Sequence, residues 1–238
     1  SNTTGTENTF IGSLAGDAIT TSNYNTALGS GALGADDLGS FSTAIGRGTL
    51  ANQNYASATN SFNTAVGTNA GEQVTTGTQN TLIGSLAGDA ITTGTRNTAL
   101  GTNSLGSNTT GDDNVAVGVN ALDTNTTGSD NTAIGKNALD DNTTGNSNVA
   151  VGLSALESNT TGNSNVVMGY SAGYSNTTGT NNTLIGRDAG NQSQTADGNV
   201  FIGEYAGRNT TNSNNTFLGT SSGWQVTSGQ KNTILGRY

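Results

Sequence analysis

The sequence contains no cysteine, no histidine and no proline, and only 10% of its residues are charged. Without histidine or cysteine, the usual catalytic triads and thiolate sites are excluded, so we expect this chain not to be an enzyme. Proline cannot donate a hydrogen bond to a neighbouring strand, and continuous strand ladders therefore exclude it. The missing proline is consistent with a chain made largely of stacked strands.

Charge and hydropathy exclude two further classes of function. The formal net charge is −9, whereas nucleic-acid binding needs a basic stripe, so we expect no nucleic-acid partner. No segment approaches the roughly 18 consecutive apolar residues of a transmembrane helix, so we expect no membrane insertion. A composition with 36 glycines also resembles low-complexity disorder, but apolar residues recur at fixed positions, which favours a folded protein.

A five-residue pattern, roughly Asn-Thr-Ala-Ile-Gly, recurs along the whole chain, almost always 17 residues after the previous copy. A fixed short period is typical of stacked coils. We therefore expect an all-β fold, a parallel β-solenoid or β-roll of about fourteen 17-residue coils, as a single repeat array over residues 1–238. The copies begin at Asn8, Asn25, Ser42, Asn63, Asn80, Asn97, Asn114, Asn131, Asn148, Asn165, Asn182, Asn199, Asn215 and Asn232.

Two positions of the pattern hardly vary. Counting each coil from its first residue, position 1 is Asn in every coil except the one that begins at Ser42, and position 5 is always Gly. Asn tolerates left-handed turns, and at the same corner of successive coils the thirteen asparagines form a candidate ladder of side-chain amides. The glycine predicts a backbone turn with positive φ or a crowded corner.

Positions 3 and 9 vary together. Where position 3 is large, position 9 is Gly, as in Phe10 with Gly16, Leu82 with Gly88, Val167 with Gly173, Leu184 with Gly190, Phe201 with Gly207 and Phe217 with Gly223. Where position 3 is Ala, position 9 is Leu, as in Ala133 with Leu139; only Ala65 with Gly71 breaks the rule. Close packing demands such a constant volume from residues that share one space. We expect positions 3 and 9 to touch in a buried layer.

Position 4 is aliphatic in every coil. Because it neighbours position 3 on a strand, it points to the opposite face. That face would then carry an aliphatic stripe larger than soluble monomers usually expose. We therefore expect a homo-oligomer, most simply three chains around a common axis. The second half of each coil, which often ends in Asn-Thr-Thr-Gly, is interpreted as a second short strand closed by a polar turn.

The regular spacing breaks once, because the coil from Ser42 is longer than its neighbours and the next copy begins only at Asn63. About four extra residues therefore lie within residues 51–62. We expect a surface loop that leaves the register of the core intact, since insertions in repeat proteins go to one face.

Aromatic residues gather beside this insertion. Tyr24, Phe41 and Phe62 each directly precede a corner position in successive coils, and Tyr55 lies within the insertion. These four residues are candidate contacts for sugar rings; alternatively, the inserted loop or a neighbouring chain covers the rings. Four further aromatics, Tyr170, Tyr174, Tyr205 and Trp224, are interpreted as separate surface residues.

Two polar columns are candidate sites. Asp123, Asp140 and Glu157 occupy position 10 of successive coils, where stacked carboxylates either form a solvated acidic rim or hold a Ca²⁺ ion between oxygen ligands. At position 12, Asn108, Asn125, Asn142, Asn159 and Asn176 begin Asn-Thr-Thr-Gly segments. These are candidate glycosylation acceptors, although the same residues also suit a turn.

Segments such as Asn131 to Leu139 and Asn114 to Leu122 follow the motif Asn-Thr/Val-Ala-Ile/Val-Gly-x-x-Ala-Leu. This motif resembles the head repeats of trimeric autotransporter adhesins and, more closely, the repeats of some phage and viral tail fibres. The resemblance implies a left-handed parallel β-roll, assembled as a trimer, with a role in attachment at an extracellular, cell-surface or virion location.

The expected function is therefore that of an extracellular structural and adhesive fibre segment, a tail-fibre or adhesin shaft, whose partners are copies of itself and a cell-surface glycan. An alternative is a self-polymerising extracellular filament subunit, because neither end of the array looks capped. A further alternative is a surface that binds ice or glycans, suggested by a column of threonines at position 14, such as Thr127 and Thr144.

Overall fold

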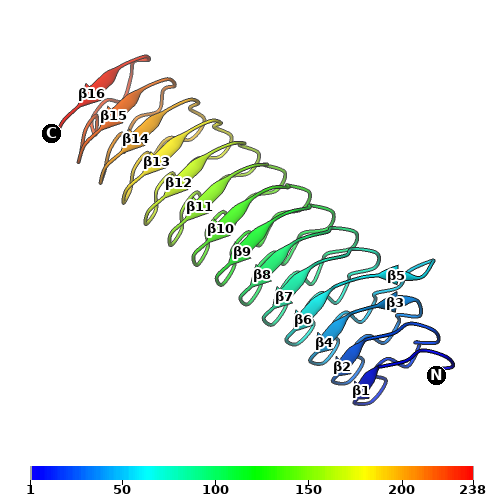
Figure 1. The fold of residues 1–238 in the computed structure, drawn as a ribbon. Coiled ribbons are helices and arrows are strands. Elements are labelled where there is room, and N and C mark those ends of the chain that lie inside the picture. The colour runs from blue at the N-terminus through cyan, green and yellow to red at the C-terminus, as the bar shows by residue number, and fades with distance from the viewer. Residues whose placement is uncertain (1, 238) are drawn as a thin grey trace. The chain divides into compact units, whose positions relative to one another are not determined.

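In the computed structural model, which describes residues 2–237, all regular secondary structure is β-strand. The chain divides into two compact units, Ser1–Val119 and Asn120–Tyr238. In each unit the strands of the main sheet occupy positions 2 to 4 of successive coils and pair in parallel, one strand per turn (Figure 1). The expected parallel β-solenoid is confirmed, and its turns follow the period of the sequence repeat.

The first unit contains seven such strands in one sheet. They are β1 (Thr9–Ile11), β2 (Thr26–Leu28), β4 (Thr43–Ile45), β6 (Thr64–Val66), β7 (Thr81–Ile83), β8 (Thr98–Leu100) and β9 (Val115–Val117). Equivalent positions pair throughout, so that Ala27 lies opposite Ala44 and Leu82 opposite Ala99. This register stacks each position of the repeat into a column.

The second unit repeats the arrangement with another seven strands. They are β10 (Thr132–Ile134), β11 (Val149–Val151), β12 (Val166–Met168), β13 (Thr183–Ile185), β14 (Val200–Ile202), β15 (Thr216–Leu218) and β16 (Thr233–Leu235). Here too the pairing joins equivalent positions, as in Phe201 opposite Phe217. The rings of these two residues stack 4.9 Å apart inside the coil.

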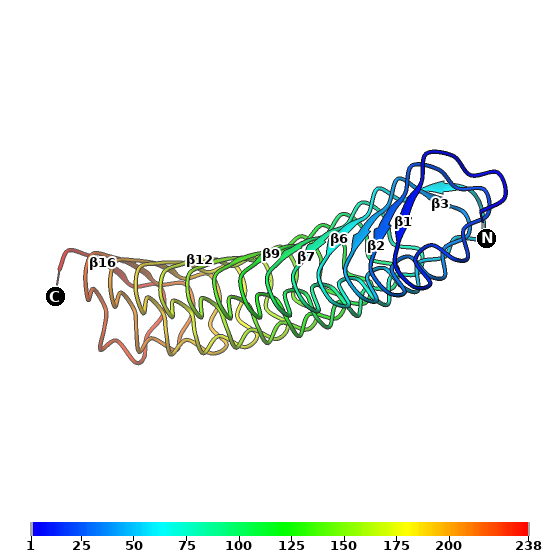
Figure 2. The ribbon, with the colours of Figure 1, turned by 90° about the horizontal axis from the view of Figure 1, so that it is seen from below.

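The expected second strand of each coil is wrong for most turns, because the backbone there forms bends and turns (Figure 2). The reason is local geometry. Asn137 and Leu139, at positions 7 and 9, have φ of 54° and 55°, which is left-handed and cannot continue an extended strand. Turns still bond to one another, for example through the Thr143 N–H to the Thr160 carbonyl at 2.9 Å.

Positions 3 and 9 share one layer of the interior, as the volume rule predicted. Both Ala133 and Leu139 are fully buried. At the exception, Ala65 with Gly71, the space is filled by other turns. A Cβ on Gly71 would lie 2.7 Å from a methyl of Leu82 and 2.9 Å from one of Leu50. The layer is therefore shared between successive coils, and constant volume need hold only across the neighbouring turns.

The corner glycine satisfies both expectations for position 5. Gly84 has a φ of +141°, and a Cβ there would meet the carbonyl group of Gly101 in the next turn, 2.6 Å from its carbon. Only glycine avoids both the backbone strain and the collision.

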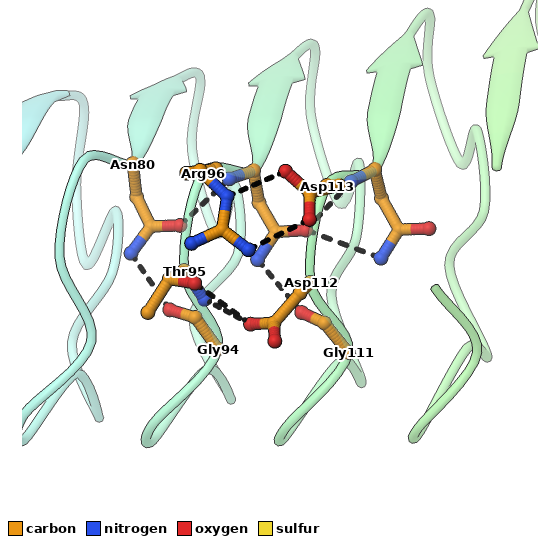
Figure 3. A network of polar contacts seen from close by, with 9 residues as sticks. Asn80, Gly94, Thr95, Arg96, Gly111, Asp112 and Asp113 are labelled. Carbon is orange, nitrogen blue, oxygen red and sulfur yellow. Dashed lines mark hydrogen bonds and ion pairs between the residues drawn. The ribbon is translucent and has the colours of Figure 1, made fainter. Parts of the chain in front are cut away.

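The corner asparagines form the expected ladder, but largely through the backbone. The Asn80 side chain donates from Nδ2 to the Gly94 carbonyl at 2.9 Å and accepts at Oδ1 from the Asn97 N–H at 2.9 Å (Figure 3). Asn97 repeats the first contact with the Gly111 carbonyl at 2.8 Å. Each buried amide thus ties its own turn to the next one, which satisfies groups that would otherwise be unpaired in the interior.

The insertion is more than the expected surface loop. The register of the core is intact, with Thr43 opposite Thr64. A second sheet joins β3 (Gly39–Ser40) to β5 (Thr59–Asn60), and it lies to one side of the main row of strands (Figure 1). In addition, Gln53 and Tyr55 are buried, so the inserted chain contributes side chains to the interior.

These buried residues explain why Ser42 replaces the corner asparagine. Gln53 donates from Nε2 to Asp36 Oδ2 and to Ser42 Oγ, each at 2.7 Å. The Ser42 hydroxyl also lies 2.6 Å from that of Ser61. A serine is short enough to leave room for the glutamine, whose Oε1 in turn accepts from Asn63 Nδ2 at 2.8 Å.

Candidate interaction surfaces

The outer face of each sheet carries the expected aliphatic column at position 4. The strands alternate, with position 3 inside and position 4 outside, as in β8, where Ala99 is buried and Leu100 is 47% exposed. In the second unit, Ile134, Met168 and Leu218 are also exposed. The stripe is therefore present in both units, and in the single chain it faces solvent.

The aromatic residues beside the insertion form a ladder of stacked rings. The rings of Tyr24 and Phe41 are 4.8 Å apart with an angle of 12° between their planes, and those of Phe41 and Phe62 are 5.3 Å apart at 25°. All three side chains are exposed, so the inserted loop does not cover them. Because Phe41 stacks on both neighbours, its two faces are already occupied, and a sugar ring needs a free aromatic face.

Tyr55 does not belong to this exposed ladder. It is only 5% exposed, and its hydroxyl donates to the Gly77 carbonyl at 2.8 Å while accepting from Asn63 Nδ2 at 3.2 Å. The expectation that Tyr55 contacts a glycan is therefore wrong, because the insertion folds this ring into the interior.

The acidic column at position 10 is a source of repulsion. Burial, together with the charges of Asp123, Asp141 and Glu157, raises the pKa of Asp140 from 3.8 to about 6. Among residues 2–237, no group of three acidic, histidine or cysteine side chains is placed to hold a metal ion. The structure therefore offers no geometry for the Ca²⁺ interpretation of Asp123, Asp140 and Glu157.

The candidate glycosylation acceptors lie in the interior. Asn108, Asn125, Asn142 and Asn159 are fully buried, and Asn176 is 2% exposed. In the second unit their amides form another ladder, in which Asn142 Nδ2 donates to Asn125 Oδ1 at 2.8 Å and to the Gly145 carbonyl at 3.0 Å. A sugar on any of these nitrogens would have to displace the ladder, so the structure argues against this modification.

The threonines next to these asparagines divide into two sets. At position 13 the hydroxyls bond to the following turn, as Thr143 does to the Thr160 carbonyl at 3.0 Å. At position 14 the side chains, including Thr127 and Thr144, are exposed. Only the second column is free to order water, whereas a flat ice-binding face would want two.

A second group of aromatic residues, interpreted from the sequence as separate, comes together in the second unit. Arg187 lies between two rings, with its Cζ 5.9 Å from the centre of Tyr170 and 5.4 Å from that of Tyr205. Arg208 lies 5.6 Å from Tyr205, whose ring stacks on Trp224 at 6.0 Å. We call these five residues the arginine–aromatic cluster. Their positions 6, 7 and 10 in consecutive coils were the signal in the sequence.

The last turn of the second unit contains an apolar hollow of about 400 Å³, lined by residues that include Trp224, Val226 and Ile234.

Within residues 2–237 no helix is long and apolar enough to cross a membrane. Comparisons of the chain with family models, with curated proteins and with solved structures return no match.

Proposed function

We propose that this chain is a non-catalytic structural and adhesive segment of an extracellular fibre, at a cell surface or on a virion, and that it assembles as a homo-oligomer, most simply a trimer. The aliphatic column at position 4 carries the proposal. The resemblance of the repeat to those of tail fibres and adhesin heads supports it, as does a sequence without histidine or cysteine.

The exposed apolar area of the column explains why a partner is needed. Covering a half-exposed Leu or Ile side chain gains on the order of 1 kcal/mol. The four exposed members of the column in the first unit, Ile11, Leu28, Ile83 and Leu100, therefore supply roughly 4 kcal/mol, against an association cost of about 4–15 kcal/mol. One column is marginal alone, whereas columns contributed by several chains together exceed the cost.

A second copy of the chain fits this surface better than an unrelated protein. The column repeats once per turn, at the spacing of about 4.8 Å between hydrogen-bonded strands. A copy of the same solenoid offers side chains with the same period, so Leu100 and its neighbours can interdigitate along the whole sheet. This self-complementarity is what a symmetric oligomer requires.

Mass measurement in solution tests the proposal. We expect the purified chain to have the mass of an oligomer, and the double variant Leu100→Asp/Ile134→Asp to be monomeric with an unchanged circular dichroism spectrum. The matched control, Thr110→Asp/Thr144→Asp, places the same charges on the exposed position 14 and should leave the mass unchanged. A wild-type chain that stays monomeric at micromolar concentration would contradict the proposal.

Negative-stain electron microscopy separates the two fibre functions. Discrete particles of a few chains support a shaft segment. Long filaments that survive dilution would instead support the self-polymerising subunit, in which chains add end to end.

A further inference from the structure

The arginine–aromatic cluster is not required by the fold. At position 6 the first unit holds Ser13, Ser30, Thr68, Ser85 and Thr102, together with Arg47 and Val119, and none of these is aromatic. Its turns nevertheless close with the same register as those of the second unit. Tyr170 and Arg187 occupy the same position in the second unit. The solenoid therefore forms without rings at this place, and their presence needs another reason.

One member of the cluster occupies a position where the backbone of each turn is left-handed. Tyr205 has a φ of 59° at position 7, where other turns carry residues such as Asn103, Asn137 and Ser154 at 54–55°. A bulky residue in the left-handed region is uncommon, and Asn is better suited to it. Leu14 and Leu86 also occupy position 7, with φ of 58° and 57°, so the conformation belongs to the repeat. At this place the Tyr205 ring lies between Arg187, Arg208 and Trp224.

The cluster remains accessible although its parts touch one another. Tyr170 is 52% exposed, and the Arg187 side chain is 57% exposed. Contacts with two rings restrict the guanidinium, so little further ordering is needed when a ligand binds. The exposed part of the cluster thus offers aromatic surface beside a preoriented set of hydrogen-bond donors.

Charge identifies the chemistry of the ligand. Arg187 Nε lies 3.4 Å from Asp188 Oδ2, and its Nη1 lies 3.7 Å from Glu204 Oε1. These carboxylates neutralise the arginine locally and would repel an acidic ligand, as would the net charge of −9. Paired donors and acceptors beside aromatic rings instead suit a ligand that is rich in hydroxyl groups and also has apolar C–H faces.

We propose that the arginine–aromatic cluster is a contact surface for a neutral carbohydrate chain. Its residues come from four consecutive coils, so an extended chain can pass from one turn to the next. The inference names a ligand for the adhesive role proposed above and rests on that role. It differs from the expected glycan contact at Tyr24, Phe41 and Phe62, where the central ring has no free face.

The chain contains a single tryptophan, and it lies in the cluster, so its fluorescence reports on this surface. We would titrate the purified chain with dextran, laminarin and galactomannan as neutral probes, and with alginate as an acidic one. We expect a saturable change in Trp224 emission with at least one neutral probe. No change with any neutral probe, or a change with alginate only, would overturn the proposal.

Two variants locate the binding. Tyr170→Ala and Arg187→Gln should each weaken the apparent affinity for the responding probe at least tenfold while circular dichroism and the melting temperature stay close to those of the wild type. Tyr24→Ala, in the stacked ladder of the first unit, is the matched control and should bind as the wild type does. Unchanged binding in both cluster variants would refute the site.

A failure of the carbohydrate proposal can be distinguished from a failure of the proposed assembly. The fluorescence titration reads ligand contact, whereas the mass measurement reads oligomer formation. An oligomer without a Trp224 response would leave the fibre proposal in place and remove the carbohydrate surface alone.

Discussion

The ring of Phe201 occupies the space that a side chain on Gly207 would need. A Cβ on Gly207 would lie 2.5 Å from Cδ2 of that ring, closer than atoms in a protein pack. In turns where position 3 is Ala, except the turn of Ala65, a buried Leu takes the place of the glycine. The two positions therefore exchange volume across one interior layer.

This exchange predicts a rescue between two substitutions. Ala133→Phe alone should overpack the layer and destabilise the chain by about 3 kcal/mol, because Leu139 is fully buried in the same turn. Adding Leu139→Gly should restore much of the stability, since it vacates the space and relieves a φ of 55°. Urea denaturation of the three proteins measures the coupling. A double variant no more stable than the single one would show that the residues do not share space.

The corner glycine predicts a severe effect from one methyl group. Gly84→Ala should destabilise the chain by roughly 3 kcal/mol or more, because its φ is +141° and the new Cβ would collide with Gly101 of the next turn. Gly31 is the control, since its φ is +68° but nothing lies within 4 Å of its Cβ position. Gly31→Ala should cost about 1 kcal/mol of backbone strain. Similar melting temperatures for the two variants would contradict the collision.

The asparagine ladder predicts a difference between two neighbouring amides. Asn148 is fully buried, donates to the Gly162 carbonyl at 2.8 Å and accepts from the Asn165 N–H at 3.0 Å. Asn148→Ala leaves both groups unpaired and should cost roughly 3 kcal/mol. The Asn146 side chain accepts from the Ser129 N–H and donates to the Thr144 carbonyl on the exposed surface, so Asn146→Ala should cost less than about 1 kcal/mol. Thermal unfolding distinguishes them, and equal losses would mean that burial of the ladder is unimportant.

The raised pKa of Asp140 predicts stability that falls as pH rises. The folded chain holds this proton up to about pH 6, whereas the unfolded chain releases it near 3.8. Between these values the folded state binds more protons, so its stability decreases with increasing pH. Asp140→Asn should remove this dependence and stabilise the chain at pH 7 by on the order of 1 kcal/mol, after screening of a partly exposed group.

Burial raises the pKa of Asp36 as well, so the pH dependence of the wild type includes both residues. The difference in the free energy of unfolding between Asp140→Asn and the wild type isolates the contribution of Asp140. Asp113 provides a control of opposite sign. Its hydrogen bond with Arg96 lowers the pKa of Asp113, so the stability from that pair is lost as the pH falls through the lowered value. Chemical denaturation from about pH 2 to 8 tests both residues. Parallel profiles for Asp140→Asn and the wild type would show that the folded chain does not raise the pKa of Asp140.

Features that repeat in every coil were predictable from the sequence. The volume rule at positions 3 and 9, the outward aliphatic at position 4 and the left-handed glycine at position 5 each follow from a local requirement imposed at every turn. Because the same requirement recurs in each coil, a single chain shows the residue preference at each position many times. The pairing of each strand with the next then follows from the period.

Features that depend on the path between the strands were not predictable in the same way. The Asn-Thr-Thr-Gly segments suited a surface turn, yet Asn142 points inward and bonds to Asn125. Tyr55 was placed with the exposed aromatics, yet it fills the interior beside Asn63. A turn-forming residue satisfies the same local rules whether its side chain faces in or out, so composition alone could not decide these cases.

The sequence by itself determined the all-β solenoid, its period and the two faces of its strands, because each follows from the spacing of apolar residues and glycines. Only the tertiary structure decided which polar side chains are buried and which distant rings meet. Tyr170 and Trp224 are far apart in the chain, and they belong to one surface because stacking brings residues of four coils to the same edge. Such contacts depend on the direction of each side chain within its turn, which the left-handed backbone at positions 7 and 9 sets.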